Sequence, residues 1–308
     1  MFTVTEISIG KTLLQMREER LTGLRCKISP ERINRRIDTE YIPGEVPPGC
    51  PFCPDSILNI TPTFSNGRRI CVGESVTFPN LFPFSEWHTV TVISREHQVD
   101  HFEKKQLLDA FTGMIKSLEG VLGYPSINWN YLPSSGASID HPHLQGMVDR
   151  RPPVLAEKYM NGGFSYYTKH GKSYWDAIRE KELGGERYLF GDEILWLAHA
   201  VPLGEREIRA MLPVSTLHDF EPYLDTFVAG LLDVIKFYRR MGTHAFNISI
   251  FFDKKPQPDT FNAFCSVIAR INPNPASISD SAFMERVHLE PVILTLPEDL
   301  GINWRKEK

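Results

Sequence analysis

The chain carries two long stretches in which apolar residues recur three and four positions apart. The first runs from Leu107 to Leu122 and the second from Leu224 to Tyr238. This spacing places apolar side chains on one face of a helix. The pattern therefore predicts two long amphipathic helices, the first ending at Gly123 and the second at Gly242.

Segments rich in β-branched and aromatic residues flank each predicted helix, as is typical of strands. They are residues 71–78, 87–94, 126–132 and 144–149 in the first half, and 187–200, 206–212, 244–252 and 264–270 in the second. Each half thus has the order strand, strand, helix, strand, strand, with Asn130 and Asn247 in the strand that follows each helix. The order predicts an α+β fold with antiparallel sheets and indicates a duplication. Residues 160–187 are expected to form a linker containing a short helix.

Composition narrows the class of protein. The 308 residues are 42% hydrophobic and 23% charged, with a net charge of −4 and no dominant run of Lys and Arg. These values are typical of a globular protein and argue against nucleic-acid binding, although a local phosphate site is compatible with them. No apolar stretch is long enough to span a membrane, and the N-terminus does not resemble a signal peptide. Five cysteines, an odd number in a chain of 308 residues, argue against a fold held together by disulfides. We therefore expect a protein of the reducing cytoplasm.

The segment "GCPFCPD" contains a Cys-x-x-Cys pair, Cys50 and Cys53. Two thiolates at this spacing can bind one tetrahedral zinc ion, although a chance pair in a loop is about equally compatible with the pattern. Two further ligands would be needed. Spacing alone does not select them, since His88, His97, His101 and His141 are all available.

The segment "GASIDHPHLQG" places His141 and His143 on either side of a proline, with Gln145 two residues later. On a strand these side chains point the same way. The two histidines could be metal ligands or core residues, or one could hold a metal while the other acts as a nucleophile. A neutral imidazole attacks phosphorus well, and Gln145 could donate a hydrogen bond to a phosphoryl oxygen. The small residues of "SSGAS" let backbone N–H groups approach a phosphate.

The segment around these two histidines resembles a known family. The segment from Asn130 to Gln145 is similar to the active-site segment of the galactose-1-phosphate uridylyltransferase family, a branch of the histidine-triad superfamily. Further segments resemble the same family's N-terminal arginine pair, zinc loop, nucleoside-binding stretch, third zinc ligand and second repeat; they are residues 20–36, 50–62, 78–84, 94–97 and 173–202. The resemblance covers most of the chain and is more specific in the first half.

The resemblance implies a fold of two histidine-triad-like repeats, each an antiparallel sheet with a long helix. The first repeat would span residues 1–160, with the metal and catalytic residues, and a degenerate second repeat would span residues 161–308. One zinc ion would be bound by Cys50, Cys53, His97 and His141. His143 would be the nucleophile that carries the nucleotidyl group, and its other ring nitrogen is expected to donate to a backbone carbonyl.

The resemblance also implies a set of substrate-binding residues. Gln145 and Ser138 would contact the phosphates, with Asn130 nearby, and Asn80 would lie near the nucleoside. Arg32 and Arg35 would bind phosphate, as the planar guanidinium allows, and could do so across the interface of a homodimer. Phe283 would lie in the segment that contacts the hexose.

The chain departs from the family pattern in its second half. Phe251, Asn262 and Phe264 stand where histidines of a second metal site would align, so a second metal is not expected. The hexose-contacting segment 281–292 keeps Phe283 but otherwise differs, which weakens any prediction of galactose specificity. Leu132 stands where a glycine is expected beside the phosphates.

Three functions are compatible with these residues. The first is a zinc-containing nucleotidyltransferase that moves a nucleoside monophosphate, with UMP preferred, between a nucleotide sugar and a sugar 1-phosphate. The second is a phosphorylase that uses the same histidine, with inorganic phosphate as the acceptor and a nucleotide sugar or dinucleoside polyphosphate as the donor. The third is a nucleotide-binding protein without catalysis. The joint presence of the nucleophile, its glutamine and the arginine pair favours an enzyme.

Overall fold

The computed structural model describes residues 1–10, 12–34, 48–99, 101–270 and 282–307. Its centre is a ten-stranded sheet in which all neighbouring strands are antiparallel. Across the sheet the strands are β4 (Ile70–Val72), β5 (Ser75–Pro79), β6 (Trp87–Val92), β8 (His143–Asp149), β7 (Tyr124–Tyr131), β12 (Ala245–Phe251), β13 (Phe264–Arg270), β11 (Ile208–Met211), β10 (Leu195–Ala198) and β9 (Tyr188–Phe190). The predicted α+β class with antiparallel strands is confirmed.

The two halves of this sheet have the same strand order. From the outer edge inward, the order in the first half is β4-β5-β6-β8-β7, and the order in the second half is β9-β10-β11-β13-β12. In both halves the last two strands are exchanged relative to their order along the chain. The halves join where β7 pairs with β12, with Asn130 directly opposite Asn247. The two asparagines noted in the sequence therefore meet at the middle of one continuous sheet. The division of the chain near residue 160 stays a prediction.

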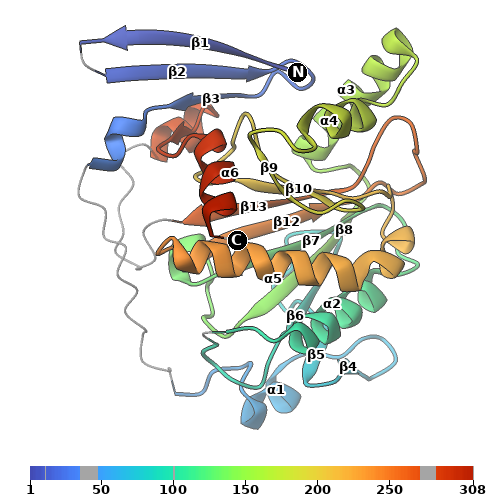
Figure 1. Ribbon diagram of the computed structural model, residues 1–308. Helices are drawn as coiled ribbons and strands as arrows, with labels where there is room; N and C mark the ends of the chain where they lie inside the picture. Colours follow the sequence, from blue (N-terminus) through green and yellow to red (C-terminus); the bar gives the residue numbers. More distant parts are fainter. Residues whose placement is uncertain (11, 35–47, 100, 271–281, 308) are drawn as a thin grey trace.

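The two predicted long helices are confirmed, and both pack on one face of the sheet (Figure 1). They are α2 (Lys104–Leu118) and α5 (Leu224–Arg240), which contact each other through residues such as Phe111 and Phe227. The prediction that the first helix continues to Gly123 is wrong. The helix ends at Leu118 because Glu119 is extended (ψ 134°) and Gly120 is left-handed (φ +76°). Leu122, expected on the apolar face of the helix, is 93% exposed.

The opposite face of the second half is covered by two further helices and a small sheet. The helices are α3 (Val154–His170) and α4 (Tyr174–Glu182), so the expected linker is mostly helical. Tyr159 and Trp175 from these helices pack on Leu195, Leu197 and Phe264 of the sheet. The small sheet consists of β1 (Phe2–Ile9), β2 (Thr12–Glu19), β3 (Arg25–Ile28) and β14 (Val292–Ile293), and α6 (Pro297–Lys306) follows it. The layer of α3 and α4 packs on the second half of the sheet, and His143, which lies on the same face in the first half, is not part of its apolar cluster.

Among the described helices, none combines the length and the apolarity that a bilayer crossing requires.

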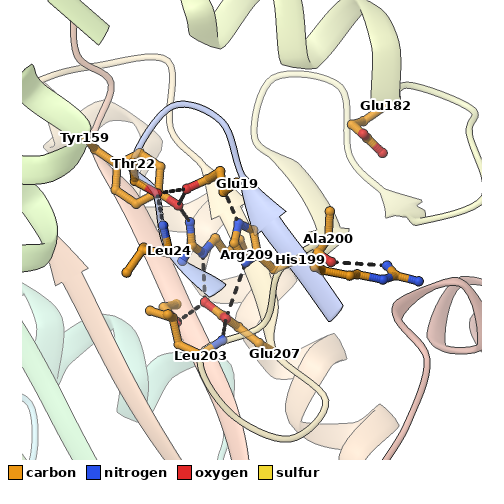
Figure 2. A network of polar contacts seen from close by, with 12 residues as sticks. Glu19, Thr22, Leu24, Tyr159, Glu182, His199, Ala200, Leu203, Glu207 and Arg209 are labelled. Atoms are coloured by element: carbon orange, nitrogen blue, oxygen red, sulfur yellow. Dashed lines mark hydrogen bonds and ion pairs between the residues drawn. The ribbon is translucent and has the colours of Figure 1, made fainter. Parts of the chain in front are cut away.

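A buried polar network joins the small sheet to the second half of the large one (Figure 2). Glu207 accepts hydrogen bonds from Arg209 Nε (2.7 Å) and Ser266 Oγ (2.6 Å), and Tyr159 donates to Glu19 (2.8 Å) and accepts from Arg209. His199 lies between the two carboxylates, 3.5 Å from an oxygen of each. Buried charges are tolerated only when they are paired, and this network provides the pairing.

The network predicts a stability that falls as the pH rises. Burial and Arg209 oppose protonation of His199, but the carboxylates of Glu207 and Glu19 outweigh them and raise its pKa. Stability gained from a raised pKa is complete below the unfolded value of about 6.5 and is lost as the pH rises through the folded value. Between pH 6 and pH 9, the free energy of unfolding measured in urea should decrease by an amount on the order of 1 kcal/mol in the parent protein. The His199→Gln variant should not show this decrease. The exposed His170→Gln variant serves as control, and equal slopes in His199→Gln and the parent would contradict this expectation.

Candidate metal and nucleophile site

The four residues predicted as metal ligands lie together. Cys50, Cys53, His97 and His141 place one ligand atom each within 4.8 Å of all the others. The measured separations are 3.9 Å from Cys50 Sγ to His141 Nδ1, 3.7 Å from Cys53 Sγ to His141 Nδ1, and 3.5 Å from Cys53 Sγ to His97 Nδ1. Of the competing histidines, His88 contacts Gln145 instead.

These separations fit a tetrahedral zinc ion. Bonds of about 2.3 Å to sulfur and about 2.0–2.1 Å to nitrogen require sulfur–nitrogen separations of about 3.6 Å, close to those measured. His141 Nε2 lies 2.8 Å from the carbonyl of Ser94, which can only accept, so Nδ1 of His141 is the unprotonated nitrogen that faces the cysteines. Burial beside Cys50 raises the pKa of the Cys53 thiol, so two thiolates here require a cation. The cluster could therefore hold one metal ion.

The local sequence explains how the two cysteines come to face the same point. Cys53 is the residue before the helix α1 (Pro54–Ile60), and Pro54 occupies the first helical turn, where a missing N–H costs nothing. The backbone N–H of Cys53 donates to the carbonyl of Cys50 (3.3 Å), which closes a tight turn. Phe52, between them, packs edge-on against His143 with ring centroids 5.2 Å apart. The metal loop and the nucleophile segment are thus in direct contact.

His143 is the first residue of β8 and has a defined tautomer. Its Nδ1 lies 2.9 Å from the backbone carbonyl of His141, which can only accept, so Nδ1 carries the proton and Nε2 has a free lone pair. Burial lowers the pKa of His143, which keeps the ring neutral at physiological pH. The side chain is 6% exposed. The carbonyl expected to fix the tautomer is therefore that of a predicted metal ligand two residues earlier.

Gln145 lies on the same face of β8 and contacts His88, which sequence reasoning considered only as a possible metal ligand. His88 Nε2 is 3.1 Å from Gln145 Oε1, and His88 Nδ1 is 3.4 Å from the backbone N–H of Phe84. Asn80 Nδ2 lies 3.2 Å from Nε2 and 3.4 Å from Nδ1 of the same ring. The backbone N–H of Phe84 can only donate, so Nδ1 is unprotonated and Nε2–H donates to Gln145. The Gln145 NH2 group is therefore the end left to face a ligand.

The loop after β7 lies beside these side chains. Leu132 has φ +71°, a conformation in which glycine is favoured, and this agrees with the glycine expected there. The 3-10 turn of Pro133–Ser135 follows, and Gly136 has φ +94°. Asn130, at the start of this segment, lies two residues beyond Asn128, the partner of Gln145 in the sheet, and so shares its face. Asn130, His143 and Gln145 thus form one polar group on this face.

Other predicted substrate-binding residues lie around or away from this group. Asn80 contacts His88 rather than Gln145, and Ser138 is exposed in the loop before His141. Arg32 belongs to the short turn Pro30–Asn34 at the small sheet, which Figure 1 shows far from α1. Phe283 is 55% exposed and packs edge-on against His288, with ring centroids 5.5 Å apart. Arg35 lies outside the described residues.

The positions discussed for a second metal are occupied by packing residues. Phe251 and Phe264 are opposite each other in β12 and β13, with ring centroids 5.1 Å apart, and Asn262 donates to the carbonyl of Leu212 (2.9 Å). Phe251 and Phe264 belong to the apolar cluster between the sheet and α3.

No family model matches this chain. An uncharacterized protein of Archaeoglobus fulgidus is 29% identical over 275 residues, which are 83% of this chain and 81% of that protein.

Solved structures show the same fold. An ADP-glucose phosphorylase from Arabidopsis thaliana superposes with a TM-score of 0.74 at 16% identity, covering 95% of this chain and 99% of that chain. A galT-like protein of the same plant gives 0.73 at 16% identity, covering 94% and 98%. A uridylyltransferase mutant gives 0.69 at 16% identity, covering 94% and 96%. The chain therefore has the fold of the uridylyltransferase and galT-like proteins, as the sequence resemblance implies.

Proposed function

We propose that this chain is an enzyme that transfers a nucleoside monophosphate through a covalent intermediate on His143. The observation that carries the proposal is the geometry of the His143 ring, whose Nδ1 is held 2.9 Å from the carbonyl of His141 and whose Nε2 has no hydrogen-bond partner within the described part of the chain. Beside it, the carboxamides of Gln145 and Asn130 have their oxygens engaged by protein donors, so their NH2 groups are left for a ligand. Such donors suit the charged oxygens of a phosphoryl group.

The proposed reaction has two steps. His143 Nε2 attacks the α-phosphorus of a nucleotide sugar, the bond from phosphorus to the bridging oxygen breaks, and a sugar 1-phosphate leaves with that electron pair. A phosphate oxygen of the second substrate then attacks the same phosphorus, and His143 departs as neutral imidazole. The carbonyl of His141 accepts a hydrogen bond from Nδ1–H of His143 throughout and stabilises the positive ring of the intermediate. Gln145 and Asn130 stabilise the charge that develops on the phosphoryl oxygens.

We assign the metal cluster to one zinc ion held by Cys50, Cys53, His97 and His141. When bound, zinc supplies rigidity and neutralises the two thiolates. It would hold His141, whose carbonyl orients His143, and so would act on the reaction through the backbone.

For the substrates, we propose a nucleotide sugar as donor, with UMP as the transferred group, and a sugar 1-phosphate as acceptor. Inorganic phosphate as acceptor is the second candidate, since proteins of this fold include a structure described as an ADP-glucose phosphorylase as well as uridylyltransferases. The departures in the segment 281–292 support a sugar other than galactose.

We extend the proposal to a homodimer. Arg32 lies beside the small sheet, whereas Cys53 precedes α1 at the other end of the structure (Figure 1). An arginine that binds phosphate from this position would reach the site of a second copy more readily than its own.

Intact-protein mass spectrometry tests the function. The purified protein is mixed separately with UDP-, ADP- and GDP-sugars, without an acceptor. We expect a mass increase equal to one nucleoside monophosphate with one donor, which identifies the base. Adding a sugar 1-phosphate or inorganic phosphate should then remove the adduct and distinguish the two acceptors. Binding of a nucleotide sugar without any adduct or turnover would overturn the proposal and favour a non-catalytic binding protein.

A further inference from the structure

Asn247, in the second half of the chain, contacts the candidate site although no sequence motif assigns it a role. Its Nδ2 lies 2.7 Å from Asn130 Oδ1 and 2.7 Å from the backbone carbonyl of Ser135. Its Oδ1 accepts a hydrogen bond from Arg270 Nε (2.7 Å). One side chain thus joins the strand that carries Asn130, the loop that follows it and the second half of the sheet.

The chemistry of the partners fixes the orientation of the Asn247 amide. Arg270 can only donate, so the atom facing it must be the amide oxygen. The carbonyl of Ser135 can only accept, so the atom facing it must be the amide nitrogen. Reversing the amide would place oxygen against oxygen at Ser135 and nitrogen against nitrogen at Arg270. The second N–H of Asn247 therefore donates to Asn130.

This orientation fixes Asn130 in turn. Because Asn130 Oδ1 accepts from Asn247, its Nδ2 is the end that faces the loop, where a Cβ placed on Gly136 would lie 3.7 Å away. Within the described part of the chain, Asn130 Nδ2 has no hydrogen-bond partner. The Asn130 N–H donor thus has a fixed orientation and lies on the sheet face that also carries His143, where it suits a phosphoryl oxygen.

We propose that Asn247, oriented by Arg270, is a positioning residue that fixes the Asn130 carboxamide with its donor toward the phosphoryl group. This inference rests on the proposed function. It gives the second half of the chain, which has no metal ligand or nucleophile of its own among the predicted residues, a direct part in the site. Arg270 is itself held by Glu285, with a separation of 3.3 Å, so the orientation extends to the segment that contains Phe283.

The test is a double-mutant cycle read by the rate of nucleotidyl-His143 formation in single-turnover mass spectrometry. Asn247→Ala should lower this rate at saturating donor by about 10-fold or more, since misplaced groups cost rate more than binding. In the Asn130→Ala background the same substitution should have little further effect, because it acts through Asn130. Asn262→Ala is the matched control, a partly buried asparagine that donates to a backbone carbonyl elsewhere in the second half.

A second readout is hydrogen exchange of the Ser135 and Gly136 amides, which donate to Leu132 and Pro133 within the loop. Asn247→Ala should accelerate their exchange, and Asn262→Ala should not. Losses of rate that add fully in the double mutant, or an unchanged rate in Asn247→Ala while the parent protein reacts, would overturn this inference alone. Failure of the parent protein to form any adduct would overturn the proposed function, and with it the catalytic part of this inference.

Discussion

Replacing His143 by alanine should abolish the nucleotidyl adduct and lower turnover by about 10⁴-fold or more, as removal of a covalent nucleophile does in other enzymes. No other described histidine can substitute for it, because each of its neighbours is already engaged. His141 Nε2 faces the carbonyl of Ser94, its Nδ1 faces the cysteines, and His88 is bonded to Gln145. The loss should appear in kcat, since His143 acts by forming a bond rather than by binding the donor.

The measurement combines intact mass with steady-state turnover for His143→Ala and for a control, His218→Ala, in which an exposed histidine before α5 is removed. Both variants should retain the metal content and the thermal unfolding temperature of the parent within a few degrees. If His143→Ala keeps the turnover of the parent, the covalent mechanism fails. If only the adduct disappears while turnover persists, the histidine is modified without being an intermediate.

Replacing Cys53 by serine should remove the metal and destabilise the fold. A hydroxyl is a far weaker zinc ligand than a thiolate, so bound zinc should fall from one ion per chain to nearly none. Loss of a structural metal is among the changes that cost about 3 kcal/mol or more. Because Phe52 and the His141 carbonyl both contact His143, the rate of adduct formation should also fall.

Metal analysis by mass spectrometry and urea unfolding measure these two effects. Cys71→Ser is the matched control, because Cys71 is exposed and lies outside the cluster. Zinc content in Cys53→Ser equal to that of the control would contradict the assignment of the cluster. Full zinc loss with unchanged stability would instead show that the ion is bound but does not support the fold.

Local signals in the sequence were sufficient for the features that depend on a few consecutive residues. The Cys50–Cys53 turn, the alternation of His141, His143 and Gln145, and the apolar faces of α2 and α5 are all encoded in short segments. The resemblance added His97, which spacing alone did not select, and the structure places it within the cluster.

Features that depend on contacts between distant segments could not be predicted. His88 and Gln145 are 57 positions apart, and Asn130 and Asn247 are 117 apart, so nothing local relates their side chains. Arg209 lies in β11 and Glu207 directly precedes it, within the segment 206–212 predicted as a strand. Their link to Glu19 through Tyr159 and His199 follows only from the docking of the small sheet. The early end of α2 lies at a turn formed by the extended Glu119 and the left-handed Gly120, which the apolar periodicity does not reveal.

The pairing of β7 with β12 has a consequence for any attempt to shorten this protein. Both strands lie in the middle of the large sheet, and residues 126–131 of β7 pair with residues 246–251 of β12. A fragment ending before residue 160 would leave β7 as a bare edge, which favours pairing with another chain. Because Asn130 faces Asn247 in matched register, the partner that best completes such a fragment is a second copy of itself, with Asn130 opposite Asn130. A self-paired fragment of this kind is also the simplest form from which a chain with two alike halves could have arisen by fusion.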